Sequence, residues 1–178
     1  MVQEIYVNEI IRDVVHEKTY RVLWISMPVS FLYWISMDNT ERIPKKLDVA
    51  EVREGLESGD YVASGETENS LIVEDELADE AKMHRDRIWN MLKDALEKDP
   101  VIYEPKPRAA LLRMVAQENS MRANNLYPYL AKYWKRGKTP NAFLPDYRNC
   151  GRSRNYEKGG YKKLGRPAKS GHGFGNVL

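Results

Sequence analysis

The stretch TYRVLWISMPVSFLYWIS, residues 19–36, decides the fold of the N-terminal part of this chain. Two runs rich in β-branched and aromatic residues flank a short break, MPV, at residues 27–29. This composition is typical of two strands joined by a turn, so we expect an antiparallel hairpin. Residues 4–15 have a similar composition. The sequence therefore predicts an α+β protein that begins with a small β-rich domain, a sheet or barrel, over residues 1–65.

A short helix is expected inside this β-rich domain. Asp48 is a residue type that caps helix N-termini, Glu51 follows three residues later, and Gly59 stands where a C-terminal cap is expected. The run GETENS, which begins at residue 65, marks an expected linker over residues 66–74. The buried side of the helix is predicted to consist of Val49, Val52 and Leu56.

Beyond the linker the apolar residues recur at helical spacing. A long amphipathic helix is predicted from residue 75 to the stop at Asp99 and Pro100, with a second helix from near Pro107 to Glu118. Asn119 and Ser120 supply the turn. The apolar residues of the two helices are Leu77, Ala81, Ile88, Leu92 and Ala95 in the first, and Leu112, Val115 and Ala116 in the second.

A third helix is predicted to end at residues 135–137. Pro128 would break a helix interior, so we expect Asn125 to be the N-cap and Pro128 to lie in the first turn. The three helices would form a helix-turn-helix domain over residues 75–137. The apolar side of the third helix is predicted to consist of Leu126, Tyr129, Leu130 and Tyr133, and Trp134 is left open.

The charges divide the chain into an acidic and a basic part. Residues 1–80 contain 7 Lys and Arg against 18 Asp and Glu, whereas residues 101–178 contain 16 against 4. Such a division indicates that the basic part meets a polyanion, and nucleic acid is the first candidate. No apolar run could cross a membrane, so we expect a cytoplasmic bacterial protein that associates with the nucleoid when bound to DNA. With one cysteine and three scattered histidines, we expect no metal, no cofactor and no catalytic residue in this chain.

The third helix carries the candidate DNA interface. With the apolar side inward, Asn124, Pro128, Ala131 and Lys135 are predicted to point outward. Arg and Asn side chains can pair bidentately with guanine and adenine, and cations can neutralise phosphates. The base-reading candidates are Arg122, Asn124, Asn125 and Tyr127. The phosphate-binding candidates are Lys132, Lys135, Arg136, Lys138 and Arg148. A basic last turn also complements the helix dipole, so the helical pattern alone is also compatible with a helical unit that does not bind DNA.

Residues 138–178 are predicted to be a basic, extended segment, largely disordered without a ligand, because they contain few aliphatic residues to bury. The run KKLGRPAK, residues 162–169, places Arg166 in a Gly-Arg-Pro context that suits a narrow minor groove. A flexible linker between domains is an equal alternative. The minor-groove or linker candidates are Arg152, Arg154, Lys162, Lys163 and Arg166.

The stretch YWKRGKTPNAFLPDYRNCG, residues 133–151, resembles a segment of the N-terminal DNA-binding region of TnsB transposases, which belong to Tn-seven-type and CRISPR-associated transposons. The matching positions are Tyr133, Trp134, Arg136, Gly137, residues 139–142, Pro145, Asp146, Tyr147, Arg148 and Asn149. Tyr127 and Leu130 also agree with the family, whereas Arg122, Asn124 and Asn125 differ, as expected if each transposon has its own end sequence.

The resemblance implies that the chain binds transposon-end repeats in double-stranded DNA, and it makes other transposition proteins candidate partners. It also implies a larger parent protein with an integrase-like core, in which an Asp-Asp-Glu triad binds two Mg²⁺ ions; none of that core is present in this sequence. Two other readings stay open. One is a stand-alone transcriptional regulator, and the other is a nuclease that uses the acidic residues Glu76, Asp79 and Glu80.

Overall fold

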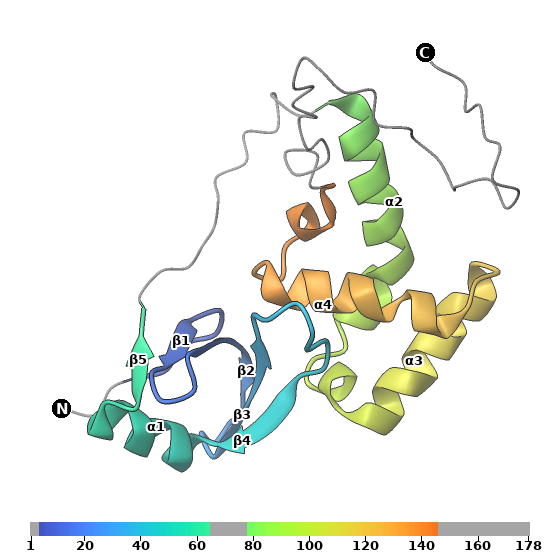
Figure 1. Ribbon diagram of the computed structural model, residues 1–178. Helices are drawn as coiled ribbons and strands as arrows, with labels where there is room; N and C mark the ends of the chain where they lie inside the picture. Colours follow the sequence, from blue (N-terminus) through green and yellow to red (C-terminus); the bar gives the residue numbers. More distant parts are fainter. Residues whose placement is uncertain (1–3, 65–77, 146–178) are drawn as a thin grey trace, which may run out of the picture. The chain divides into compact units, whose positions relative to one another are not determined.

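The computed structural model describes residues 4–64 and 78–145 (Figure 1). Its N-terminal half is an antiparallel sheet in the order β4-β3-β2-β1-β5. Helix α1 (Val49–Ser58) lies between the last two strands in the sequence. The predicted α+β fold and the hairpin are confirmed. The strands are β1 (Ile10–Asp13), β2 (Lys18–Ile25), β3 (Phe31–Ser36), β4 (Lys45–Asp48) and β5 (Tyr61–Ala63).

The hairpin of β2 and β3 is fastened at its turn by one buried hydroxyl group. Ser26 Oγ accepts hydrogen bonds from the backbone N–H groups of Ser30 (3.0 Å) and Phe31 (2.9 Å), and it donates one to the carbonyl of Pro28 (2.8 Å). A β-bulge between Val22 and Trp24 shifts the register of the pair. These bonds satisfy one backbone group within the MPV break and two directly after it.

The strand β3 is buried on both of its sides. Leu32 and Trp34 belong to one core cluster with residues of α1, whereas Tyr33 and Ile35 belong to a second cluster with residues of the C-terminal helices. This division follows from the two-residue period of a strand, which sends neighbouring side chains to opposite faces of the sheet. Each face of the sheet therefore packs into a different hydrophobic core.

Helix α1 has the capping that its sequence predicts. The Asp48 carboxylate accepts a hydrogen bond of 2.7 Å from the backbone N–H of Ala50, and Gly59 closes the helix at a φ of 86°. A positive φ is easily adopted by glycine, which has no Cβ. The residues that α1 buries against the sheet are the three predicted ones, Val49, Val52 and Leu56.

The C-terminal half is helical. Helices α2 (Asp79–Leu96), α3 (Pro105–Glu118) and α4 (Tyr127–Lys135) alternate with the 3₁₀ helices η2 (Val101–Tyr103), η3 (Ala123–Asn125) and η4 (Pro140–Phe143). Helix α3 begins two residues before the expected Pro107. The first helix was expected from residue 75, and residues 75–77 lie outside the described residues.

Helix α4 has its proline where it was expected but a different cap. Pro128 lies in the first turn, as predicted. The N-cap position belongs to Leu126, so the prediction of Asn125 is wrong. Asn125 is part of η3, and its backbone N–H donates to the carbonyl of Arg122 (2.9 Å). The 3₁₀ turn therefore takes the place of a side-chain cap.

The helical core is built around aromatic side chains. Trp134 is 1% exposed, and Tyr133 stacks on Phe143 with 5.8 Å between the ring centroids. Tyr129 packs against the same cluster, so the assignment of Tyr129 and Tyr133 to the core is confirmed. Ala131 was expected to point outward and is buried. The outward assignment is wrong because α4 is covered on more than one side.

By contacts between residues, residues 4–64 and 78–145 belong to one compact unit. The expected linker, residues 66–74, lies outside the described residues. Residues 138–145 were expected to begin the extended segment, but Ala142, Phe143 and Leu144 are buried. This correction has a clear cause, since η4 adds the side chains of Ala142 and Phe143 to the helical core. Residues 146–178, which hold the rest of the predicted basic tail, lie outside the described residues.

Candidate nucleic-acid interface

Helices α3 and α4 and the turn between them form a helix-turn-helix arrangement (Figure 1). Ser120 adopts a φ of 51° at the end of α3, and the backbone N–H of Met121 donates to the carbonyl of Ala116 (2.9 Å). Leu126 is fully buried and anchors the chain before α4 begins. The turn is therefore fixed by backbone hydrogen bonds on one side and by an apolar anchor on the other.

The turn brings the four base-reading candidates together. Arg122, Asn124 and Asn125 are exposed on or beside η3, directly before α4. Tyr127, the first residue of α4, is half-buried and packs against the helical core. Within residues 78–145, the side chains of Arg122 and of the two asparagines make no hydrogen bond to another described residue. Their donors and acceptors are available to a ligand.

Two of the predicted phosphate-binding residues hold η4 against α4. Lys132 Nζ donates to the carbonyl of Leu144 at 2.7 Å. Arg136 Nη1 lies 3.4 Å from the carbonyl oxygen of Ala142 and 3.3 Å from that of Leu144. Carbonyl groups at the end of a short 3₁₀ helix lack helical partners, and these cations satisfy them.

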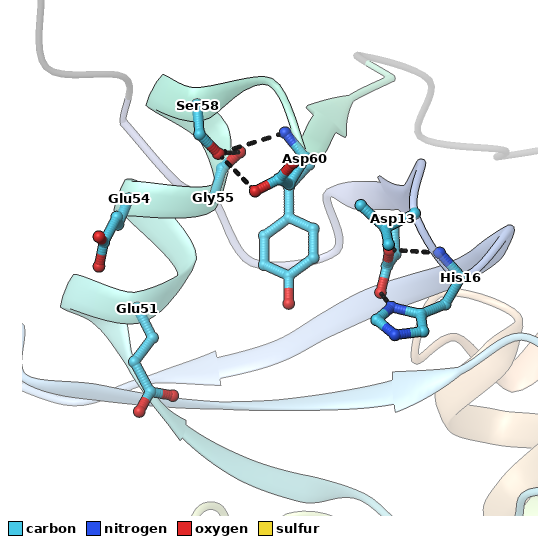
Figure 2. Close-up of a pocket in the computed structure, with 9 residues that line it drawn as sticks. Asp13, His16, Glu51, Glu54, Gly55, Ser58 and Asp60 are labelled. Atoms are coloured by element: carbon cyan, nitrogen blue, oxygen red, sulfur yellow. Dashed lines mark hydrogen bonds and ion pairs between the residues drawn. The ribbon is translucent and has the colours of Figure 1, made fainter.

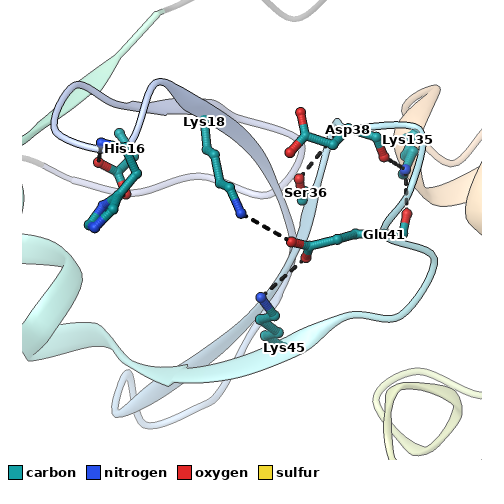
Figure 3. Close-up of polar contacts among 8 residues, drawn as sticks. His16, Lys18, Ser36, Asp38, Glu41, Lys45 and Lys135 are labelled. Carbon is teal, nitrogen blue, oxygen red and sulfur yellow. Dashed lines mark hydrogen bonds and ion pairs between the residues drawn. The ribbon is translucent and has the colours of Figure 1, made fainter.

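Lys135, at the end of α4, reaches the sheet domain. Figure 3 shows its amino group donating to the backbone carbonyls of Asp38 and Glu41, in the loop between β3 and β4. Burial lowers the pKa of Lys135 from its ordinary value. The Glu41 carboxylate in the same loop pairs with Lys18 (3.4 Å) and Lys45 (3.2 Å).

Lys138 makes a second connection to the sheet. Its amino group donates to the carbonyl of Leu23 in β2 (3.2 Å) and to the Asp99 carboxylate. Nearby, Asn8 Nδ2 donates to the carbonyl of Gly137 at 3.3 Å. The four described phosphate-binding candidates thus all have partners within the chain, and their contact with DNA stays a prediction. No local sequence signal could have indicated these partners, because those of Lys135 and Lys138 lie up to 115 residues away.

The remaining predicted site residues lie outside the described residues. These are Arg148 among the phosphate-binding candidates, and Arg152, Arg154, Lys162, Lys163 and Arg166 among the minor-groove candidates.

A hollow of about 410 Å³ lies beside α1, on the N-terminal half (Figure 2). It is lined by the carboxylates of Asp13, Glu51, Glu54 and Asp60, together with His16. Burial alone would raise the pKa of Asp13, but hydrogen bonds from the backbone and side chain of His16 hold it below its ordinary value. This anionic hollow repels phosphate, so it does not belong to a DNA interface.

Within residues 4–64 and 78–145, no group of three or more His, Cys, Asp or Glu side chains could hold a metal ion. Of the acidic residues considered for a nuclease, Asp79 and Glu80 lie in the first turn of α2, where carboxylates favour the helix dipole. Glu76 lies outside the described residues. No described helix is long and apolar enough to cross a membrane.

The described residues form a small antiparallel sheet that is joined to a helix-turn-helix unit. Residues 4–64 match the family model of the TnsB N-terminal SH3-like domain, and residues 85–147 match that of the TnsB second domain. The Transposon Tn7 transposition protein TnsB of Escherichia coli is 38% identical over 77 residues, which are 43% of this chain and 11% of that relative. This chain belongs to the TnsB family, and the aligned segment covers only a small part of that relative's length.

Proposed function

We propose that this chain binds double-stranded DNA at the ends of its transposon, as the N-terminal part of a TnsB-type transposase. The observation that carries the proposal is the match of residues 85–147 to the TnsB second domain, which falls on the helix-turn-helix unit. The exposed Arg122, Asn124 and Asn125, directly before α4, support it. These side chains suit base edges in a major groove, where the N-terminal residues of a recognition helix make their contacts.

Strand transfer belongs, in this proposal, to a catalytic core elsewhere in the parent protein. That core would carry the Asp-Asp-Glu triad and its Mg²⁺ ions, and this chain would bind DNA without cutting or joining it. Other transposition proteins are the further partners, and the nucleoid is the place of action.

The proposal is tested by fluorescence anisotropy with the whole chain. A duplex from the end of the transposon that encodes it is compared with a shuffled duplex of equal composition, over a series of salt concentrations. We expect tighter binding to the end duplex that persists at moderate salt, because base contacts depend less on salt than phosphate contacts do. Equal affinity for both duplexes at every salt concentration would refute end recognition.

The variants N124A and N125A should each weaken binding to the end duplex by about 1–3 kcal/mol and leave binding to the shuffled duplex nearly unchanged. N90A is the matched control, because Asn90 is an exposed asparagine on α2. If the two test variants lose the same affinity on both duplexes, the base-reading assignment fails.

A further inference from the structure

The exposed side of α3 is a cationic surface. At 100° per residue, four positions of α3 fall within about 60° of one another, on the side opposite to the buried Leu112 and Val115. All four are exposed. They are Lys106, Ala110, Arg113 and Gln117.

This side of α3 carries no carboxylate. Lys106 and Arg113 make no hydrogen bond or ion pair with any other described residue, and neither does Arg122 beyond the turn. Helix α2 differs, because its surface mixes both signs of charge. There Lys82 pairs with Asp79 (3.8 Å) and Arg85 with Asp86 (2.7 Å).

The cations at the end of α4 differ from those of α3 because they already have hydrogen-bond partners within the chain. Lys132, Lys135 and Lys138 already donate to backbone carbonyls, so a phosphate could take them only by breaking these bonds. Breaking a hydrogen bond to a charged donor costs free energy, which water recovers only in part at a half-buried carbonyl. Lys106 and Arg113 bear no such cost.

We propose that Lys106 and Arg113, on the exposed side of α3, make the main phosphate contacts of the helix-turn-helix unit. This inference rests on the proposed function and names its backbone-binding surface. The first helix of a helix-turn-helix pair crosses the DNA backbone while the second enters the groove, and α3 is the first helix here. The two residues are seven positions apart, about 10 Å along the helix axis, which suits phosphates a few nucleotides apart.

The test measures the dependence of affinity on salt for the double variant K106A/R113A. Each lost phosphate contact should lower the slope of log K against log salt by about 0.9, so the double variant should lose about 2 in slope. Affinity should fall roughly fivefold to tenfold per contact at 0.1 M salt, by the same factor for the end duplex and the shuffled duplex. The double variant R87A/K98A is the control, because it removes the same net charge from exposed positions elsewhere in the helical half.

A slope that falls no further in K106A/R113A than in R87A/K98A would overturn the inference, and so would a loss confined to the end duplex. Thermal unfolding of both double variants checks that they remain folded, and K106Q/R113Q repeats the test with longer side chains. Failure of the proposed function is a separate result. The proposed function fails if the unmodified chain binds both duplexes with equal affinity. The role of α3 is decided separately, by the salt slopes of the two double variants.

Discussion

Lys138 connects three parts of the chain. Its backbone has a conformation that few residues other than glycine adopt. Its φ of 61° lies in the left-handed region. Its amino group reaches the carbonyl of Leu23 and the carboxylate of Asp99, and it lies 5.6 Å from the centroid of the Tyr103 ring. An L-residue in this region costs about 1–2 kcal/mol, so the contacts of the side chain offset backbone strain.

Replacing Lys138 should therefore give different results for alanine and glycine. K138A loses the charged hydrogen bonds and should lower the free energy of unfolding by about 1.5–3 kcal/mol. K138G loses the same bonds but relieves the strain, and should be about 1 kcal/mol more stable than K138A. Urea unfolding followed by tryptophan fluorescence measures both values. Equal stability of the two variants would show that the backbone conformation carries no strain.

Buried tyrosines give the unit a dependence on alkaline pH. Burial raises the pKa of Tyr133 to about 12 from an ordinary value of 10. Burial and the hydrogen bond to Glu104 likewise raise the pKa of Tyr33 to about 12. Between pH 10 and 12 the unfolded chain loses these protons and the folded chain keeps them. The stability they contribute is therefore fully present below pH 10 and is lost as the pH rises to 12.

The variant Y133F removes the hydroxyl group of Tyr133, with its ionisable proton, and keeps the aromatic ring. Between pH 10 and 12 the free energy of unfolding of Y133F should fall less steeply than that of the unmodified protein. The two slopes should differ by up to about 1.4 kcal/mol per pH unit. Urea titrations of both proteins at several pH values from 9 to 12 measure the difference. Parallel curves for the two proteins would show that Tyr133 ionises equally well in the folded state.

At the scale of the elements, the sequence predicts those parts whose causes are local. The hairpin follows from β-branched and aromatic runs around a proline, and α1 follows from Asp48 and Gly59 at its ends. The turn between α3 and α4, and the place of Pro128 in the first turn of α4, also follow from nearby residues. The exposure of Asn124 is of the same kind, because it was predicted from the place of this residue opposite the apolar side of the third helix.

Other features of α4 depend on residues far away in the sequence. Ala131 is buried although its position on the helix predicts exposure. The end of α4 is basic, as the dipole favours, but Lys135 is bonded to the loop before β4, more than 90 residues earlier. Such partners are set by tertiary packing, which periodicity and residue type along the chain do not encode.

At the scale of the whole described unit, the sheet joins two cores. Val22 and Leu32 pack on the side of α1, and Leu23 and Ile35 pack on the side of the helices. The helical core therefore depends on side chains from the N-terminal half. We infer that residues 4–64 and 78–145 unfold as one cooperative unit.

Native-state hydrogen exchange tests this cooperation. The best protected amides of β3 and α2 should exchange with the same free energy of opening. V52A, a change in the core beneath α1, should lower that free energy by about 2 kcal/mol in both elements. V62A is the control, since Val62 is 49% exposed. An effect of V52A on β3 alone would show that the halves unfold independently.

The sheet also separates opposite charges in space, with the anionic hollow beside α1 on one side and the cationic α3 among the helices on the other. The folded unit consequently has an electric dipole moment across the sheet. In the proposed binding to DNA, this dipole would rotate the molecule before any contact forms, so that encounters begin with α3 toward the polyanion. Mobile ions shorten the range of this torque to about 8 Å at physiological salt. Orientation would then occur only in the last step of approach.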